Sequence, residues 1–241
     1  MTSVIKHYRN LLKLNSEFFN KLEKDPISLS MFTSAHNFSS DYEKLYEIIE
    51  DKPESQLLRL SIREYQFALF AASTSNYRHA YMSLRLAFEL ALGSILFSAH
   101  ELHLREWQKN SRHIVWDSLV DPSTGVFAVN FIRAFTPELD SFGVQYAAIA
   151  RTVYRECSEY VHGNLHTHRN PDEKMDFSST ELQAWAQKAS SVHLAIIFAF
   201  TGRYFDALPS KKLLLIEGII LERLGEIPFL RAVYQELGKK Q

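Results

Sequence analysis

The sequence has little of several residue types whose abundance would define other classes of protein. Cys157 is the one cysteine in 241 residues, so an internal disulfide framework is excluded and we expect a reducing, cytoplasmic compartment. The Met-Thr-Ser start lacks the basic and then apolar pattern of a secretory signal. An excess of one charge is also missing, since Lys+Arg 27 and Asp+Glu 28 give a net charge of −1. Any contact with nucleic acid must therefore come from a local patch.

Long hydrophobic runs are missing as well. No apolar run approaches the roughly 20 residues that cross a bilayer. The best candidates are residues 194–200 and 213–221, and Glu217 interrupts the second. We expect both runs to lie in core helices, and we expect no membrane partner.

Glycine and proline are scarce, with 8 and 7 residues, while the hydrophobic content is 46%. The breakers fall mostly between stretches with helical apolar spacing, and alternating strand-like runs are missing. The sequence therefore predicts an all-α fold, a helical bundle with extra N- and C-terminal helices. The predicted helices cover residues 2–23, 28–50, 56–72, 77–106, 128–134, 143–161, 178–206, 211–223 and 228–237. The short turn at 73–76 predicts an antiparallel hairpin, and Ser178 with Glu181 forms a capping-box pattern.

Two charged residues interrupt the apolar stretch 84–97. Arg85 and Glu89 are four residues apart, so they share one helix face and can form an ion pair. One interpretation is a structural salt bridge, because an unpaired buried charge is costly. The other is a polar groove that orients a facing helix, for which residues 143–161 are the candidate.

That candidate helix carries a polar stripe near its end. Arg155 and His162 are seven residues apart, so they fall within about 20° of one line along the helix. Arg151 and Ser158 share the stripe, and with Arg85 and Glu89 they make the predicted polar network. A guanidinium and an imidazole together can hold a phosphate and move a proton near neutral pH.

A second patch is modestly basic. Arg105, Lys109 and Arg112 lie close to Trp107 and Trp116, so they suit phosphate contacts with base stacking. An ordinary solvated helix end with packed tryptophans is the simpler explanation of the same residues.

Metal and thiol chemistry find less support in the sequence. His162, His166 and His168 fit no familiar zinc spacing, and we expect neither a metal nor a cofactor. The five-residue offset turns Cys157 about 140° away from His162 on one helix, so a thiol–imidazole pair is not expected.

The helix that contains Leu84, Arg85 and Glu89, followed later by Tyr154, Arg155, Ser158, His162 and Gly163, resembles the HEPN superfamily (higher eukaryotes and prokaryotes nucleotide-binding). It is most similar to bacterial members with an "LR…E" helix and a "Y…S…HG" helix. The resemblance covers residues 56–206. On this basis residues 1–55 are an N-terminal helical extension, 56–206 a HEPN-like core, and 207–241 C-terminal helices of one all-helical domain.

The resemblance implies a bundle of four or five helices, usually dimeric, in bacterial defence or toxin systems. Active members are metal-independent endoribonucleases that leave a 2′,3′-cyclic phosphate. Carried over, Arg155 would hold the scissile phosphate and His162 would shuttle the proton. Glu156 stands where the family commonly has Asn, Asp or His. Two roles therefore stay open, an accessory or effector subunit that acts with RNA or a protein partner, and an endoribonuclease that works across a homodimer.

Overall fold

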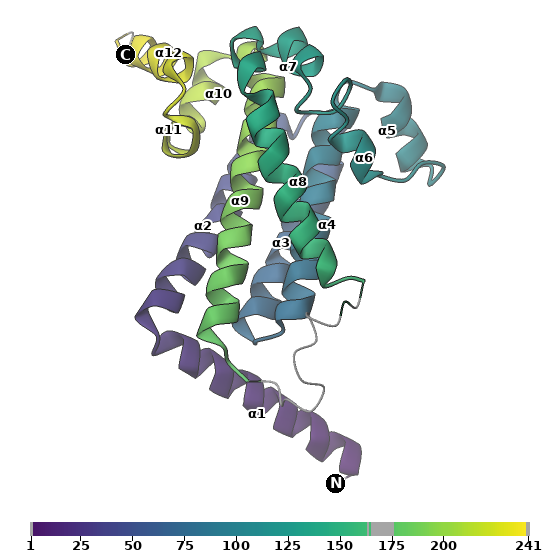
Figure 1. Ribbon diagram of the computed structural model, residues 1–241, viewed down its shortest axis with the longest axis vertical. Helices are drawn as coiled ribbons and strands as arrows, with labels where there is room; N and C mark the ends of the chain where they lie inside the picture. The colour runs from purple at the N-terminus through teal and green to yellow at the C-terminus, as the bar shows by residue number, and fades with distance from the viewer. Residues whose placement is uncertain (1, 163, 165–175, 240–241) are drawn as a thin grey trace.

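The computed structural model describes residues 2–162, 164 and 176–239, and these form helices with no β-strand among them (Figure 1). The all-α prediction is confirmed. The α-helices are α1 (Ser3–Glu23), α2 (Pro26–Ile49), α3 (Ser55–Ser73), α4 (Tyr77–Phe97), α5 (Glu101–Gln108), α6 (Trp116–Leu119), α7 (Val129–Phe135), α8 (Gly143–Glu159), α9 (Ser179–Tyr204), α10 (Ser210–Leu215), α11 (Glu217–Leu224) and α12 (Pro228–Gly238). Two described 3-10 helices, η1 (Pro137–Phe142) and η3 (Phe205–Ala207), flank α8 and α9.

The long helices α2, α3, α4, α8 and α9 form the bundle (Figure 1). α9 contacts α2, α4 and α8, and α4 contacts α3, α8 and α9. Both helices bury large side chains fully, among them Phe88 of α4 and Trp185 and Phe198 of α9. Burial of this apolar surface drives the bundle together, with α4 and α9 at its centre.

The predicted hairpin of α3 and α4 is present. The two helices pack along their lengths, and the Ser61 hydroxyl of α3 donates to the Ala87 carbonyl of α4 at 2.7 Å. Between them Ser75 takes a left-handed conformation with φ of 59°, and the Asn76 N–H donates to the Ala71 carbonyl at 2.8 Å. This turn reverses the chain within three residues.

Helix starts follow the capping residues. The Asp25 carboxylate accepts from the Ser28 N–H at 3.2 Å, with Pro26 in the first turn of α2. The Ser178 hydroxyl accepts from the Glu181 N–H at 3.2 Å at the start of α9. Both contacts satisfy N–H groups that a helix start leaves without a partner.

Two predicted helices are divided in the structure. The prediction of one helix over 77–106 is wrong, because the chain turns at residues 98–100 between α4 and α5. Arg203 of α9 donates to the Ser98 hydroxyl at 2.6 Å and to the Ser98 carbonyl at 3.3 Å, which holds that turn. The predicted helix 211–223 is likewise divided at Ile216, where the Tyr234 hydroxyl binds the Leu213 carbonyl at 3.2 Å.

α4 is long and apolar enough to cross a membrane by length and composition, although Arg85 and Glu89 lie within it. Neither of the two runs singled out in the sequence meets that test among the described residues. The apolar window of α4 is 72% buried inside the protein, as the core helix of a bundle is.

The terminal helices extend the bundle at opposite ends (Figure 1). α1 crosses one end and continues past it, while α10, α11 and α12 lie at the other. α2 packs against α3 and α9 and contributes Phe38, Tyr42 and Leu45 to the common core. Residues 1–55 therefore share their core with the rest of the described chain.

Candidate nucleic-acid interface

Arg85 and Glu89 of α4 form the ion pair that their spacing predicts. The Arg85 Nη2 lies 3.0 Å from Glu89 Oε1, and both side chains are mostly buried. Their partner on the facing helix is Tyr154 of α8. The Tyr154 hydroxyl donates to Glu89 Oε1 at 2.5 Å and accepts from Arg85 Nη2. These three side chains, the Arg85 network, join α4 to α8.

Aromatic packing completes the Arg85 network. The Tyr154 ring stacks on Trp116 with centroids 3.6 Å apart and planes 1° from parallel, while the Arg85 guanidinium lies over the Tyr154 ring at 4.6 Å. Burial, and then the Glu89 carboxylate, raises the pKa of Tyr154 to about 12. The hydroxyl therefore stays protonated and keeps its role as donor to Glu89.

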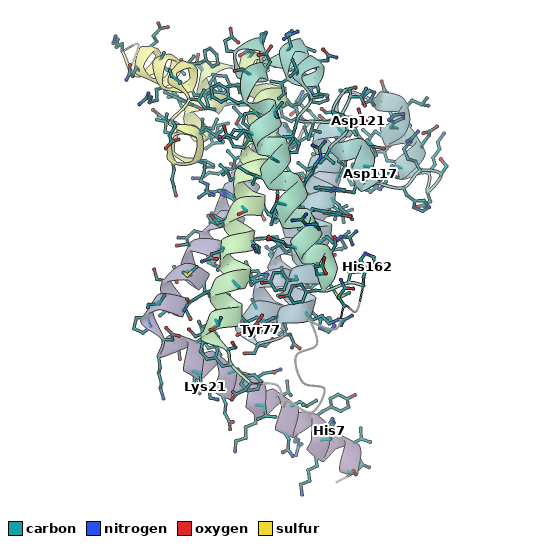
Figure 2. The ribbon with its side chains drawn as sticks, in the orientation of Figure 1. His7, Lys21, Tyr77, Asp117, Asp121 and His162 are labelled. Atoms are coloured by element: carbon teal, nitrogen blue, oxygen red, sulfur yellow. The ribbon has the colours of Figure 1, made fainter. Side chains whose placement is uncertain are left out.

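Arg155 and His162, the predicted phosphate and proton groups, lie at the lower end of α8. Both residues are exposed, and Figure 2 shows His162 just beyond that end of α8. α8 ends at Glu159, two residues before the predicted Val161. The chain continues in a turn in which the Ser158 carbonyl accepts from the N–H groups of Val161 and His162 at 2.9 and 3.3 Å. The predicted cap Gly163 lies outside the described residues.

The acidic residue beside Arg155 is paired. Lys188 of α9 lies 2.6 Å from the Glu156 carboxylate, and the Asn164 side chain donates to Glu159. The sequence gives no local sign of the Lys188 contact because the two residues lie on different helices. The pair offsets the negative charge that Glu156 brings to this end of α8.

Arg151 and Ser158 have partners outside the Arg85 network. The Arg151 guanidinium donates to the Val120 carbonyl at 2.5 Å, and the Ser158 hydroxyl donates to the Tyr154 carbonyl of its own helix at 2.7 Å. Tyr154, which the sequence analysis names only as part of the family resemblance and not as a member of the polar network, takes the place expected for them. Its signal is its position in the row 147, 150, 154 and 157, which follows helical spacing on the buried side of α8.

The basic cluster of α5 is largely neutralised by neighbouring carboxylates. Arg105 pairs with Glu101 at 3.2 Å and Arg112 with Glu106 at 2.6 Å, while Lys109 is exposed. Exposed pairs of this kind are weak and screened by salt. They leave the guanidinium groups able to exchange a carboxylate for a phosphate.

Cys157 is buried, and burial raises the pKa of its thiol to about 12. A thiol in this setting is a poor nucleophile because little thiolate forms at neutral pH. Among the described residues no group of three or more His, Cys, Asp or Glu side chains is placed to hold a metal ion. His166 and His168 lie outside the described residues.

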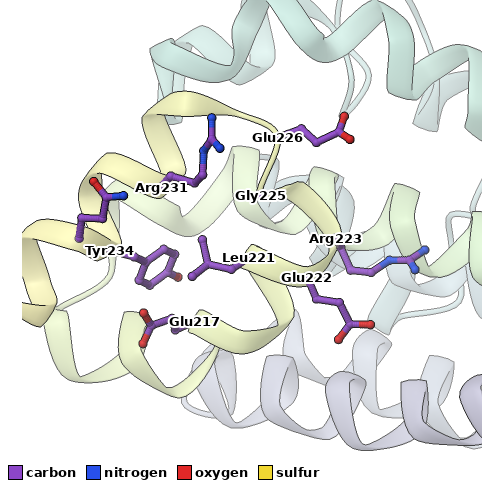
Figure 3. A pocket seen from close by; sticks show the side chains of 9 residues that line it. Glu217, Leu221, Glu222, Arg223, Gly225, Glu226, Arg231 and Tyr234 are labelled. Carbon is purple, nitrogen blue, oxygen red and sulfur yellow. The ribbon is translucent and has the colours of Figure 1, made fainter.

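A cavity of about 470 Å³ lies between α11 and α12, and Figure 3 shows Leu221 and Tyr234 facing each other in it, with Glu217 beside them. The lining side chains are Glu217, Leu221, Glu222, Arg223, Gly225, Glu226, Arg231, Tyr234 and Gln235. The Arg223 guanidinium already binds Ser190 at 2.8 and 3.0 Å. None of the candidate site residues predicted from the sequence lines this cavity.

No family model, curated protein or solved structure matches this chain. The functional argument therefore starts from the arrangement of α4, α5 and α8 alone.

Proposed function

We propose that this chain is an RNA-binding, HEPN-like accessory or effector subunit of a cytoplasmic bacterial defence or toxin system. In this proposal Arg155 and His162 hold an RNA phosphate at the end of α8. The observation that supports it is an exposed guanidinium near the end of α8 and an exposed imidazole in the turn that follows, beside a helix turn in which Tyr154 is bonded to Arg85 and Glu89. Arg155 loses little backbone freedom on binding, because the helix that carries it is already ordered.

The charge distribution favours a local phosphate site at the end of α8 over a general attraction of the whole molecule to RNA. The net charge of −1 gives no general attraction to polyphosphate. At the end of α8, however, Lys188 offsets Glu156, so the charge of Arg155 is not cancelled by its neighbour in sequence. Arg is the side chain best suited to a phosphate, since its planar fork donates two parallel hydrogen bonds.

The same pair supports a second candidate function, a metal-independent endoribonuclease that works across a homodimer. His162 would take the proton from a ribose 2′-hydroxyl, and the 2′-oxygen would attack the adjacent phosphorus. The bond to the 5′-oxygen would break, and an imidazolium of either copy would protonate that oxygen. Arg155 would stabilise the charge on the phosphoryl oxygens, and a 2′,3′-cyclic phosphate would remain.

One RNA experiment tests both functions. The purified chain is mixed with labelled single-stranded and hairpin RNA in EDTA, and binding and cleavage are measured together at two salt concentrations. We expect the wild type to bind, and Arg155→Ala and His162→Ala each to weaken binding. The loss for Arg155→Ala is expected to be about tenfold, since a hydrogen bond to a charged group contributes about 1.5 kcal/mol.

Arg63→Ala and His36→Ala serve as matched controls, because both residues are exposed and lie on α3 and α2, away from α8. Their binding should equal that of the wild type. If the wild type fails to bind RNA, or binds unchanged after both α8 substitutions, the proposed function is wrong. Cyclic-phosphate products that disappear in His162→Ala would establish the nuclease, while binding without cleavage would leave the accessory role.

A further inference from the structure

The structure brings together two groups of residues that lie apart in the sequence. A cleft of about 310 Å³ separates α4 from the chain at residues 107–114. Glu89 of the Arg85 network lines it on one side, and Trp107 and Arg112 of the basic cluster line it on the other. The remaining lining residues are Leu86, Leu90, Asn110, His113 and Ile114.

Glu89 presents an unused acceptor in this cleft. Its Oε1 atom is occupied by Tyr154 at 2.5 Å and by Arg85 at 3.0 Å. Its Oε2 atom accepts no hydrogen bond from the residues that the structure describes, and it is not among their buried atoms that lack a partner. Oε2 therefore keeps some accessible surface, and Glu89 is one of the residues that line the cleft. The contacts of Oε1 fix the orientation of the whole carboxylate, including Oε2. A partly desolvated carboxylate oxygen in a fixed position is a selective acceptor for an N–H donor.

The walls of the cleft suit a flat ring. Leu86, Leu90 and Ile114 are apolar, and Trp107 adds a half-buried indole. Gly93 of α4 allows Ile114 to pack close to that helix, because a Cβ at position 93 would lie 3.0 Å from Ile114 Cδ1. Stacking on an aromatic side chain is a common source of affinity for bases in single-stranded complexes.

The charges favour a base over an amino acid. Arg112 supplies the one guanidinium among the lining residues and is paired with Glu106 at 2.6 Å, so a ligand carboxylate would have to displace the carboxylate that is already there. Asn110, at the rim, has a left-handed backbone with φ of 57°. Such a conformation is uncommon outside glycine.

We propose that this cleft binds a nucleobase with an exocyclic amino group, in single-stranded RNA, through a hydrogen bond from that amino group to Glu89 Oε2. This inference extends the proposed RNA binding and rests on it for the source of the base. Cytosine donates from its N4 amino group. Uracil presents O4 at the same position, and two acceptors repel, so uracil is disfavoured.

The test compares cytosine with uracil, which have rings of the same size. Cytidine and uridine monophosphates are titrated into the full chain and followed by NMR shifts. Octacytidylate and octauridylate are then compared by fluorescence anisotropy. We expect the cytosine compounds to bind at least about fivefold tighter, which corresponds to about 1 kcal/mol. Glu89→Gln should bring the ratio to about one, since an amide both donates and accepts.

A second variant avoids any change to the Arg85 network. Leu86 is 41% exposed, so Leu86→Trp should fill the cleft without disturbing the fold and abolish monophosphate binding. Leu215→Trp, at a residue 43% exposed on α10, is the matched control and should bind as the wild type does.

The outcomes separate the two proposals. Equal affinity for cytosine and uracil, or a preference for cytosine that survives Leu86→Trp, overturns the cleft proposal even if RNA binding at α8 stands. Cytidine monophosphate binding without any oligonucleotide binding overturns the proposed function and leaves the base site. No binding of any of these compounds overturns both.

Discussion

His193 of α9 is a buried residue whose titration couples to stability. It is 1% exposed, its ring stacks on Phe38 with centroids 4.0 Å apart, and Tyr42 meets it edge-on. Its Nε2 lies 3.1 Å from Asp41 Oδ2, but off the direction of a hydrogen bond. Burial lowers the pKa of His193, with Arg223 acting the same way and Asp41 and Glu222 opposing them.

This histidine should make the protein less stable in mild acid. The unfolded chain binds a proton on His193 below about pH 6.5, and the folded chain resists it. The stability that this group contributes is therefore fully present above that pH and falls as the pH drops, with a slope of at most about 1.4 kcal/mol per pH unit. We expect His193→Gln to flatten urea-unfolding free energies between pH 6.5 and 5, whereas His36→Gln, at an exposed histidine, leaves the wild-type slope. Equal slopes for all three would contradict this.

At the same scale, the sequence predicts local pairs and misses distant ones. The Arg85–Glu89 pair follows from a four-residue spacing. Tyr154 is 69 residues from Arg85, and nothing in either local pattern says that the two meet. Arg155 and His162 are both exposed, but the sequence could show neither that α8 ends before His162 nor that Lys188 offsets Glu156.

At the scale of helices, starts are easier to predict than ends. Asp25 before Pro26, and Ser178 before Glu181, carry their signals within a few residues of the helix start. The break after α4 depends on Arg203, which is 105 residues from Ser98. Local propensity does not encode such a contact. The sequence around residues 98–100 therefore predicts a continuous helix over 77–106, where the structure has two.

The Ser178 cap gives a test of this local control. Ser178→Ala removes the acceptor for the Glu181 N–H, so we expect a loss of about 1 kcal/mol in the free energy of unfolding. Thr2→Ala is the matched control, because the Thr2 side chain makes no capping hydrogen bond at the start of α1. Thermal and urea unfolding of both variants measure the difference. A loss for Thr2→Ala as large as that for Ser178→Ala would rule out a specific role for the cap.

At the scale of the whole molecule, α1 is unevenly supported. Its second half packs on the bundle through Phe18 and Leu22, which are 3% and 1% exposed. Its first half extends past the bundle (Figure 1), and Val4, Tyr8 and Leu12 are 62%, 62% and 66% exposed. The packing of one helix thus changes along its length.

The two halves should respond differently to the same substitution. We expect Leu22→Ala to cost about 3 kcal/mol, because it leaves a cavity in the core. Leu12→Ala should change stability by less than about 0.5 kcal/mol, as exposed substitutions do. Urea unfolding of the two variants, read by circular dichroism, gives both values. Comparable losses at residues 12 and 22 would mean that the first half of α1 is also covered.

The burial of α4 has a consequence during synthesis. Until α8 and α9 emerge from the ribosome, the nascent chain holds a segment as apolar as a membrane span, with α3 as its one long neighbour already made. α9 begins at Ser179, more than eighty residues after α4 ends at Phe97. During that interval the apolar face of α4 is open to chaperones and to other chains.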